Sequence, residues 1–242
     1  MKSTVLTDMQ KKPLMVAHRG LSGIETENTA AAFVAAGNRT YYGVECDVHK
    51  TLDGKYVVIH DHDTARVAGG DGLQVRQSTF DALRALTLLD CTTGEPRGDL
   101  VIPTLAEYIQ ICKRYGKRAV LELKDDFTEA EILEICDIIA GLDYLDCVTF
   151  ISFCYQNLVY LRKKYPAQSA QLLKSHPADD LIDRLTAYHL DLDFNHKNLT
   201  REMVEQCHRN GIKVNTWTVD DPARAAELAD WGVDYITTNI LE

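Results

Sequence analysis

Short apolar runs alternate with segments of helical periodicity from about residue 100 to the end of the sequence. Residues 104–115 and 128–142 repeat apolar side chains at helical spacing, and a Thr128–Glu131 capping-box pair opens the second segment. The segment between them, 118–124, is short and densely apolar, as expected of a strand covered on both faces. Strands and helices in alternation predict βαβ units and a parallel sheet.

The alternation extends to the first part of the chain and yields a strand count. An additional strand at 56–60 follows an Asp-Gly turn and is expected to form a hairpin. The alternative of an open doubly wound sheet lacks its glycine-rich first turn, because the stretch HRGLSG is not GxGxxG. Eight βα units in about 240 residues instead predict a (β/α)8 TIM barrel, an α/β fold. The barrel strands are predicted at 14–18, 43–48, 118–123, 147–152, 168–173, 189–194, 212–218 and 234–238.

One segment, residues 62–101, interrupts this rhythm. It contains the cluster AGGDG and has irregular periodicity, with one short helical piece at 78–86. A stretch of this length inside a barrel is typical of a lid or a small insertion, so we expect an insertion after the second strand. No linker or low-complexity tract marks a boundary elsewhere, and residues 1–242 are expected to form a single TIM-barrel domain.

Charge and composition exclude several classes of protein. A formal net charge of −10 argues against a nucleic-acid binder but not against an anionic small molecule, because a metal or a local Arg/Lys pair reverses the potential within one cleft. No apolar run approaches the ~20 residues that span a bilayer, and the N-terminal stretch is not typical of a signal peptide. The seven cysteines lack framework spacing, which favours reduced thiols and a cytoplasmic location.

Charged and imidazole side chains collect at the ends of the predicted strands. In a barrel of this type the C-terminal strand ends form the active site. Glu45 and Asp47 lie two apart on one strand, so their side chains share a face. The residues expected at this end are His18, Arg19, Glu45, Asp47, His60, Glu122 and Lys124.

The three carboxylates among these residues predict a metal site. Carboxylates with apolar neighbours are costly unless a cation holds them. Oxygen ligands from Glu45, Asp47 and Glu122 suit Mg²⁺ or Ca²⁺, whereas zinc would require more histidine or cysteine. Arg19, Lys124 and a divalent cation beside two histidines are suited to phosphoryl chemistry. The absence of a P-loop motif argues against nucleotide-dependent transfer.

The other histidines and nearby acids are given lesser roles by their positions. Four residues fall in loop-like stretches and are expected at most to support the site: His49, His62, Asp61 and Asp63. The remaining histidines are expected on the surface or on helices: His176, His189, His196 and His208.

The ordered set of motifs resembles the glycerophosphodiester phosphodiesterase family, in its cytoplasmic bacterial type. The set consists of HRG, ENT, E-x-D-V, T-x-DG-x-x-VV-x-HD and LE-x-K, with the strongest block at residues 17–61 and weaker matches to the end of the chain. The resemblance implies a (β/α)8 barrel with an insertion after the second strand. It also implies metal-dependent hydrolysis of a glycerophosphodiester to glycerol 3-phosphate and an alcohol, in lipid and glycerol metabolism.

The resemblance assigns roles to individual residues. Glu45, Asp47 and Glu122 would bind one Mg²⁺ or Ca²⁺ ion, and His18 and His60 would be the general acid/base pair. The phosphate would be held by Arg19 and Lys124, the site would be supported by Asn28, and the glycerol would pack against Trp217. In related enzymes the substrate's own glycerol hydroxyl can attack phosphorus and form a cyclic phosphate, which is an alternative route.

This sequence departs from the family pattern at two places. Many relatives have Asp where this chain has Asn239, and the 62–101 insertion, which is expected to cover the alcohol group, matches least well. Two rival functions are another phosphodiesterase on the same barrel, such as a phospholipase, and an inert barrel that only binds phosphodiesters. The retained histidines and carboxylates argue against the inert barrel. The alcohol specificity, the choice between Mg²⁺ and Ca²⁺, and the oligomeric state, a homo-oligomer included, stay open.

Overall fold

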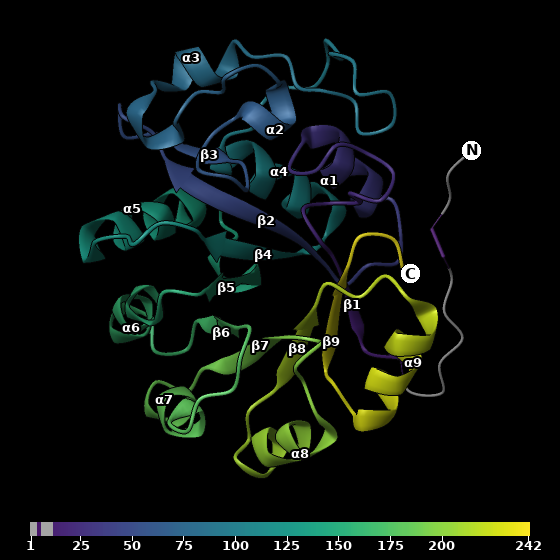
Figure 1. Ribbon diagram of the computed structural model, residues 1–242. Coiled ribbons are helices and arrows are strands. Elements are labelled where there is room, and N and C mark those ends of the chain that lie inside the picture. Colours follow the sequence, from purple (N-terminus) through teal and green to yellow (C-terminus); the bar gives the residue numbers. More distant parts are fainter. Residues whose placement is uncertain (1–3, 6–11) are drawn as a thin grey trace.

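The computed structural model describes residues 4–5 and 12–242, and its centre is a closed ring of parallel strands (Figure 1). Each barrel strand pairs with the next along the chain, and the first strand also pairs with the last, which closes the ring. The strands are β1 (Leu14–Ala17), β2 (Gly43–Lys50), β4 (Arg118–Leu123), β5 (Val148–Ser152), β6 (Ser169–Lys174), β7 (Asp191–Asn195), β8 (Val214–Trp217) and β9 (Tyr235–Thr238). The predicted TIM barrel is therefore confirmed.

Helices surround the ring on its outer side (Figure 1). The apolar faces of these helices pack on the strands. Tyr108 on the helix that follows the insertion, for example, is fully buried, and its hydroxyl donates a hydrogen bond to the carbonyl of Val44 at 2.7 Å. The helices that follow barrel strands are α1 (Ala30–Gly37), α4 (Leu105–Tyr115), α5 (Glu129–Ala140), α6 (Tyr155–Lys164), α7 (Leu181–Ala187), α8 (Arg201–Arg209) and α9 (Pro222–Trp231).

The segment after β2 forms the predicted insertion. Strand β3 (Tyr56–Val58) pairs antiparallel with the end of β2, as the hairpin prediction required. The elements that follow are α2 (Ala65–Ala68), η1 (Val75–Gln77) and α3 (Phe80–Arg84), of which only α3 corresponds to a predicted helix. The insertion has an apolar cluster of its own, comprising Val57, Ile59, Val67, Val75, Leu83, Leu88, Leu100 and Ile102. This small core fixes the insertion beside α1 and α4 (Figure 1).

The boundaries of the predicted strands differ from the structure by a few residues. The largest consequence concerns β2, which was predicted to end at residue 48 and continues to Lys50, so that His49 lies on a strand and not in a loop. A 3-10 turn, η2 (Leu145–Cys147), precedes β5 and was not predicted. Within the described residues, no helix has the length and apolar character that crossing a membrane requires.

Helix α5 provides a test of the capping-box prediction. The Thr128 side chain accepts a hydrogen bond from the Glu131 main-chain N–H, and the Glu131 carboxylate accepts one from the Thr128 N–H at 2.8 Å. Replacement of Thr128 by Ala should lower the free energy of unfolding by about 1 kcal/mol, because a helix N–H loses its acceptor. Urea denaturation measures the change. Thr128→Ser keeps the hydroxyl and is the control; equal stability of the Ala and Ser variants would contradict the assignment.

Candidate active site

A pocket at the C-terminal end of the barrel brings the predicted site residues together. Its wall contains seven of the nine predicted residues. The other two, Asn28 and Asp47, lie directly behind this wall. The Asn28 amide donates a hydrogen bond to Asp47 Oδ2 at 2.7 Å. The lining residues are His18, Arg19, Glu45, His60, Glu122, Lys124, Ile151, Phe153, Leu173, Asp193, Trp217, Thr218 and Thr237.

Strand register places the three carboxylates side by side. Asp47 on β2 is the direct partner of Glu122 on β4, and Glu45 lies on the same face of β2 as Asp47. One oxygen from each of the three carboxylates lies within 4.8 Å of the others. This arrangement follows from the alternation of side chains along two paired strands.

Burial and mutual repulsion dominate the electrostatics of this group. Burial, together with the charges of Asp47 and Glu122, raises the pKa of Glu45 well above its usual value. The pKa of Glu122 is raised to about 7 by burial and by the Asp47 charge. Although burial also raises the pKa of Asp47, the Arg19 and Lys124 charges outweigh it, so this pKa lies below the ordinary value and Asp47 stays ionised.

The donor set fits a hard divalent cation. Asp47 Oδ1 is buried and has no hydrogen-bond partner, although Lys124 Nζ lies 3.5 Å away and also contacts Glu122 Oε1 at 3.0 Å. A buried carboxylate oxygen without a donor has coordination capacity to spare. Three converging carboxylates provide the oxygen ligands that Mg²⁺ and Ca²⁺ prefer.

The loop after β1 supplies Arg19, and hydrogen bonds and ion pairs join this residue to nearby carboxylates. The Arg19 main-chain N–H donates to Glu45 Oε2 at 2.7 Å, and its guanidinium pairs with Glu27 at 2.9 Å and with Asp47 at 3.5 Å. Arg19 and Asn28 both have positive φ angles near 55°, and the Asn28 N–H bonds the Arg19 carbonyl. Glu27 was missed by the sequence analysis, although it stands in the quoted ENT motif.

His18 is held by the C-terminal end of β9. Its Nδ1 lies 2.8 Å from Asn239 Oδ1, which also accepts a hydrogen bond from the Ser22 hydroxyl. The Asn239 amide donates in turn to Asp220, and this fixes the oxygen toward His18. Because an amide oxygen only accepts, His18 carries its proton on Nδ1 and leaves Nε2 free. Burial and the Arg19 charge lower the pKa of His18 to about 4, so the ring is neutral near pH 7.

His60 has a carboxylate partner. Its Nδ1 lies 2.6 Å from Asp61 Oδ1, and Arg66 Nε donates to the other Asp61 oxygen at 2.6 Å. Although burial raises the pKa of Asp61, the bonds from Arg66 and His60 lower it to about 2. Burial lowers the pKa of His60, while the Asp47 charge and the Asp61 bond oppose that change. Asp61, expected only to support the site, thus directly orients a predicted catalytic ring.

Two further pocket residues were missed by the sequence analysis. Asp193 on β7 is 1% exposed, its Oδ1 has no partner, and burial with the Glu122 charge raises its pKa well above the usual value. Phe153 is 44% exposed and meets Trp217 edge-on, with ring centroids 5.7 Å apart. Asp193, like Glu45 and Asp47, is a carboxylate near the end of a predicted strand, so the sequence does contain a signal for it. The strand pattern alone gives no comparable signal for Phe153.

A barrel with acidic, cationic and imidazole side chains at the C-terminal ends of its strands is typical of a TIM-barrel enzyme, and comparison with known proteins identifies the family. The model of the Glycerophosphoryl diester phosphodiesterase family matches residues 18–242. A glycerophosphodiester phosphodiesterase of Caldanaerobacter subterraneus subsp. tengcongensis is 31% identical, with 94% of each chain covered. The chain therefore belongs to the glycerophosphoryl diester phosphodiesterase family.

Solved structures agree with this membership. An Oleispira antarctica phosphodiesterase in complex with the product sn-glycerol-3-phosphate superimposes with a TM-score of 0.83 at 26% identity, covering 94% of this chain and 93% of that one. A glycerophosphodiester phosphodiesterase from Parabacteroides distasonis superimposes with a TM-score of 0.77 at 26% identity, covering 98% and 94%. The barrel and the family membership thus rest on both sequence and structure.

Proposed function

We propose that the protein hydrolyses glycerophosphodiesters to glycerol 3-phosphate and an alcohol, with one Mg²⁺ or Ca²⁺ ion held by Glu45, Asp47 and Glu122. The observation that carries the proposal is the pocket itself. Two histidines and the cationic side chains of Arg19 and Lys124 meet the three carboxylates there. The product named in the Oleispira antarctica complex supports the same chemistry for this chain.

The cationic side chains of Lys124 and Arg19 would hold the substrate phosphate. Lys124 and Arg19 line the pocket, and each also contacts Asp47, so their charges are directed at the place where the carboxylates converge. A bound divalent cation would polarise the phosphoryl oxygens and stabilise the charge that develops on them. Asn28 would keep Asp47 in place through its 2.7 Å hydrogen bond.

The two histidines would divide proton transfer between them. His18 is neutral near pH 7 and its Nε2 carries no proton, so this ring suits the general base. Burial lowers the pKa of both rings, but at His60 the Asp47 charge and the ionised Asp61 on Nδ1 oppose this change, so of the two rings His60 is better suited to be the general acid that protonates the leaving alcohol.

Trp217 and its neighbours would receive the carbon skeleton of the glycerol. Trp217 packs against the apolar cluster of Val16, Val120, Ile151 and Leu173 at the pocket wall. We further propose that residues 1–242 act as one barrel domain whose 62–101 insertion borders the alcohol group. A cytoplasmic location is supported by the cysteines, because all seven are unpaired.

The substrate assignment is tested by coupled detection of glycerol 3-phosphate. Glycerophosphocholine and related diesters should release it in the presence of Mg²⁺ or Ca²⁺, because Arg19 and Lys124 in the pocket wall can hold the phosphate. Intact phosphatidylcholine vesicles are the control for a phospholipase. Release of diacylglycerol or phosphocholine from vesicles, with no glycerol 3-phosphate from the soluble diesters, would contradict the proposal.

The histidine roles are tested by replacement of each ring. His18→Ala and His60→Ala should each lower kcat by ~10²-fold or more, as expected for loss of a general acid or base. His208→Ala is the matched control, because His208 lies on α8 and pairs with Asp234 outside the pocket. Normal turnover in both pocket variants would refute the assignment.

The metal site is tested by removal of the cation and by binding. EDTA should abolish turnover, and Mg²⁺ or Ca²⁺ should restore it, because the buried carboxylates need a counter-charge. Calorimetric titration should show that Asp47→Asn binds the cation more weakly than the wild type does. Full activity in EDTA, or unchanged affinity in Asp47→Asn, would show that the carboxylates do not hold the catalytic ion.

A further inference from the structure

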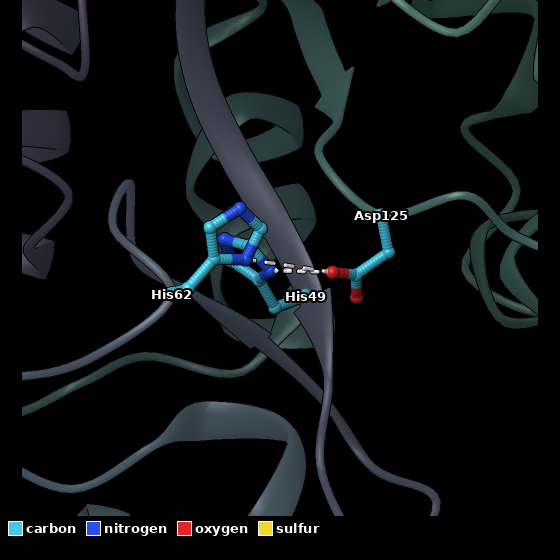
Figure 2. Close-up of side chains that lie close together, drawn as sticks. All are labelled: His49, His62 and Asp125. Atoms are coloured by element: carbon cyan, nitrogen blue, oxygen red, sulfur yellow. Dashed lines mark hydrogen bonds and ion pairs between the residues drawn. The ribbon is translucent and has the colours of Figure 1, made fainter.

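A second cluster of titratable side chains lies close together (Figure 2), and one of its rings contacts the main chain of His60, which lines the pocket. It contains His49 from β2, Asp125 from just after β4, and His62. His49 is fully buried, lies two residues beyond Asp47, and shares the face of β2 that carries Glu45 and Asp47. The proposed mechanism gives none of these three residues a role.

Both ring nitrogens of His49 have hydrogen-bond partners. Nδ1 lies 2.9 Å from Asp125 Oδ1, and Nε2 lies 3.2 Å from the main-chain carbonyl oxygen of His60. A carbonyl oxygen only accepts, so Nε2 is the donor in the second contact. The ring therefore links a buried carboxylate to the main chain of a pocket histidine.

Asp125 is itself held firmly. Its Oδ2 accepts a hydrogen bond from the Lys50 main-chain N–H at 3.1 Å and pairs with Arg76 at 3.0 Å. Although burial raises the pKa of Asp125, the bond and charge of His49 and the Lys50 N–H outweigh it and keep the group ionised. A fixed carboxylate on Nδ1 sets the orientation of the imidazole ring.

These contacts favour a hydrogen-bonded bridge over a second metal site. The potential ligand atoms of His49, His62 and Asp125 lie within 4.8 Å of one another. However, both His49 nitrogens and both Asp125 oxygens already have partners. The His62 side chain is 71% exposed, with Nδ1 4.0 Å from Asp125 Oδ1, and its ring meets the His49 ring edge-on. His62 thus covers the bridge on its solvent side.

We propose that His49, anchored by Asp125, is a positioning residue that fixes the main chain of His60 and thereby aims its imidazole into the pocket. His60 lies two residues beyond the end of β3, so strand pairing does not hold it directly. The catalytic part of this inference rests on the proposed role of His60 as a general acid. The hydrogen bond by which His49 fixes the main chain of His60 does not depend on that role.

Two substitutions at position 49 separate the two contacts. In His49→Gln the amide nitrogen reaches the place of Nε2 and can still donate to the His60 carbonyl. In His49→Asn the amide nitrogen reaches only the place of Nδ1, so it keeps Asp125 and loses His60. Arg76→Gln is the matched control, because it removes an ion pair from the same carboxylate and leaves the bridge intact.

Amide hydrogen exchange of the segment 59–63 and steady-state kinetics are measured for all three variants, with thermal unfolding as the check on folding. His49→Asn should exchange faster in this segment and should lose about 10- to 100-fold in kcat with little change in KM, because a small displacement of a reacting group is costly. His49→Gln and Arg76→Gln should resemble the wild type in both respects.

Two results would overturn the inference. One is unchanged exchange and kcat in His49→Asn. The other is an equal loss in His49→Gln and His49→Asn, which would mean that removal of the imidazole ring, and not loss of the bond to His60, causes the effect. If the wild type releases no glycerol 3-phosphate, the proposed function fails, while the exchange rates still decide whether His49 holds the His60 loop.

Discussion

The repulsion among three buried carboxylates is the constraint on which the rest of the site depends. The pairing of Asp47 with Glu122 is set by the register of β2 and β4, and Glu45 cannot leave the same face of its strand. Like charges this close, in surroundings that screen weakly, require compensating positive charge. Arg19, from the loop after β1, and Lys124, from the end of β4, provide part of it. The same burial and positive charge keep His18 neutral, so the electrostatics of the carboxylates and of the proposed general base have one origin.

Much of this arrangement could be predicted from the sequence because it follows from strand periodicity. Once the strands of a parallel barrel are located, their C-terminal ends must share one end of the molecule. Two carboxylates two residues apart must then point the same way, and this placed Glu45 and Asp47 correctly without any knowledge of contacts. The starts of α4 and α5 were equally accessible, because Thr104 after Pro103 and the Thr128–Glu131 capping box are local signals.

The parts that could not be predicted depend on contacts between distant segments. Asn239 counted only as a departure from the family pattern, yet its amide oxygen holds His18 across 221 positions of sequence. His49 was placed in a loop because its strand was predicted two residues too short, and its partner Asp125 lies 76 positions away. The insertion's own core has no regular period, since its apolar residues come from short turns and not from long elements.

Closure of the barrel is therefore a condition for the chemistry as well as for stability. The support of His18 comes from the end of β9, which reaches β1 only when the first and last strands pair. The support of His60 comes from the ends of β2 and β4, through His49 and Asp125. Each histidine is thus held by neighbouring strand ends, and β2 and β4, whose ends support His60, also carry the three carboxylates. An opening of the β1–β9 seam would release His18 from Asn239 while leaving the β2–β4 carboxylate pair intact, so the proposed proton transfer by His18 would be lost before the proposed metal site.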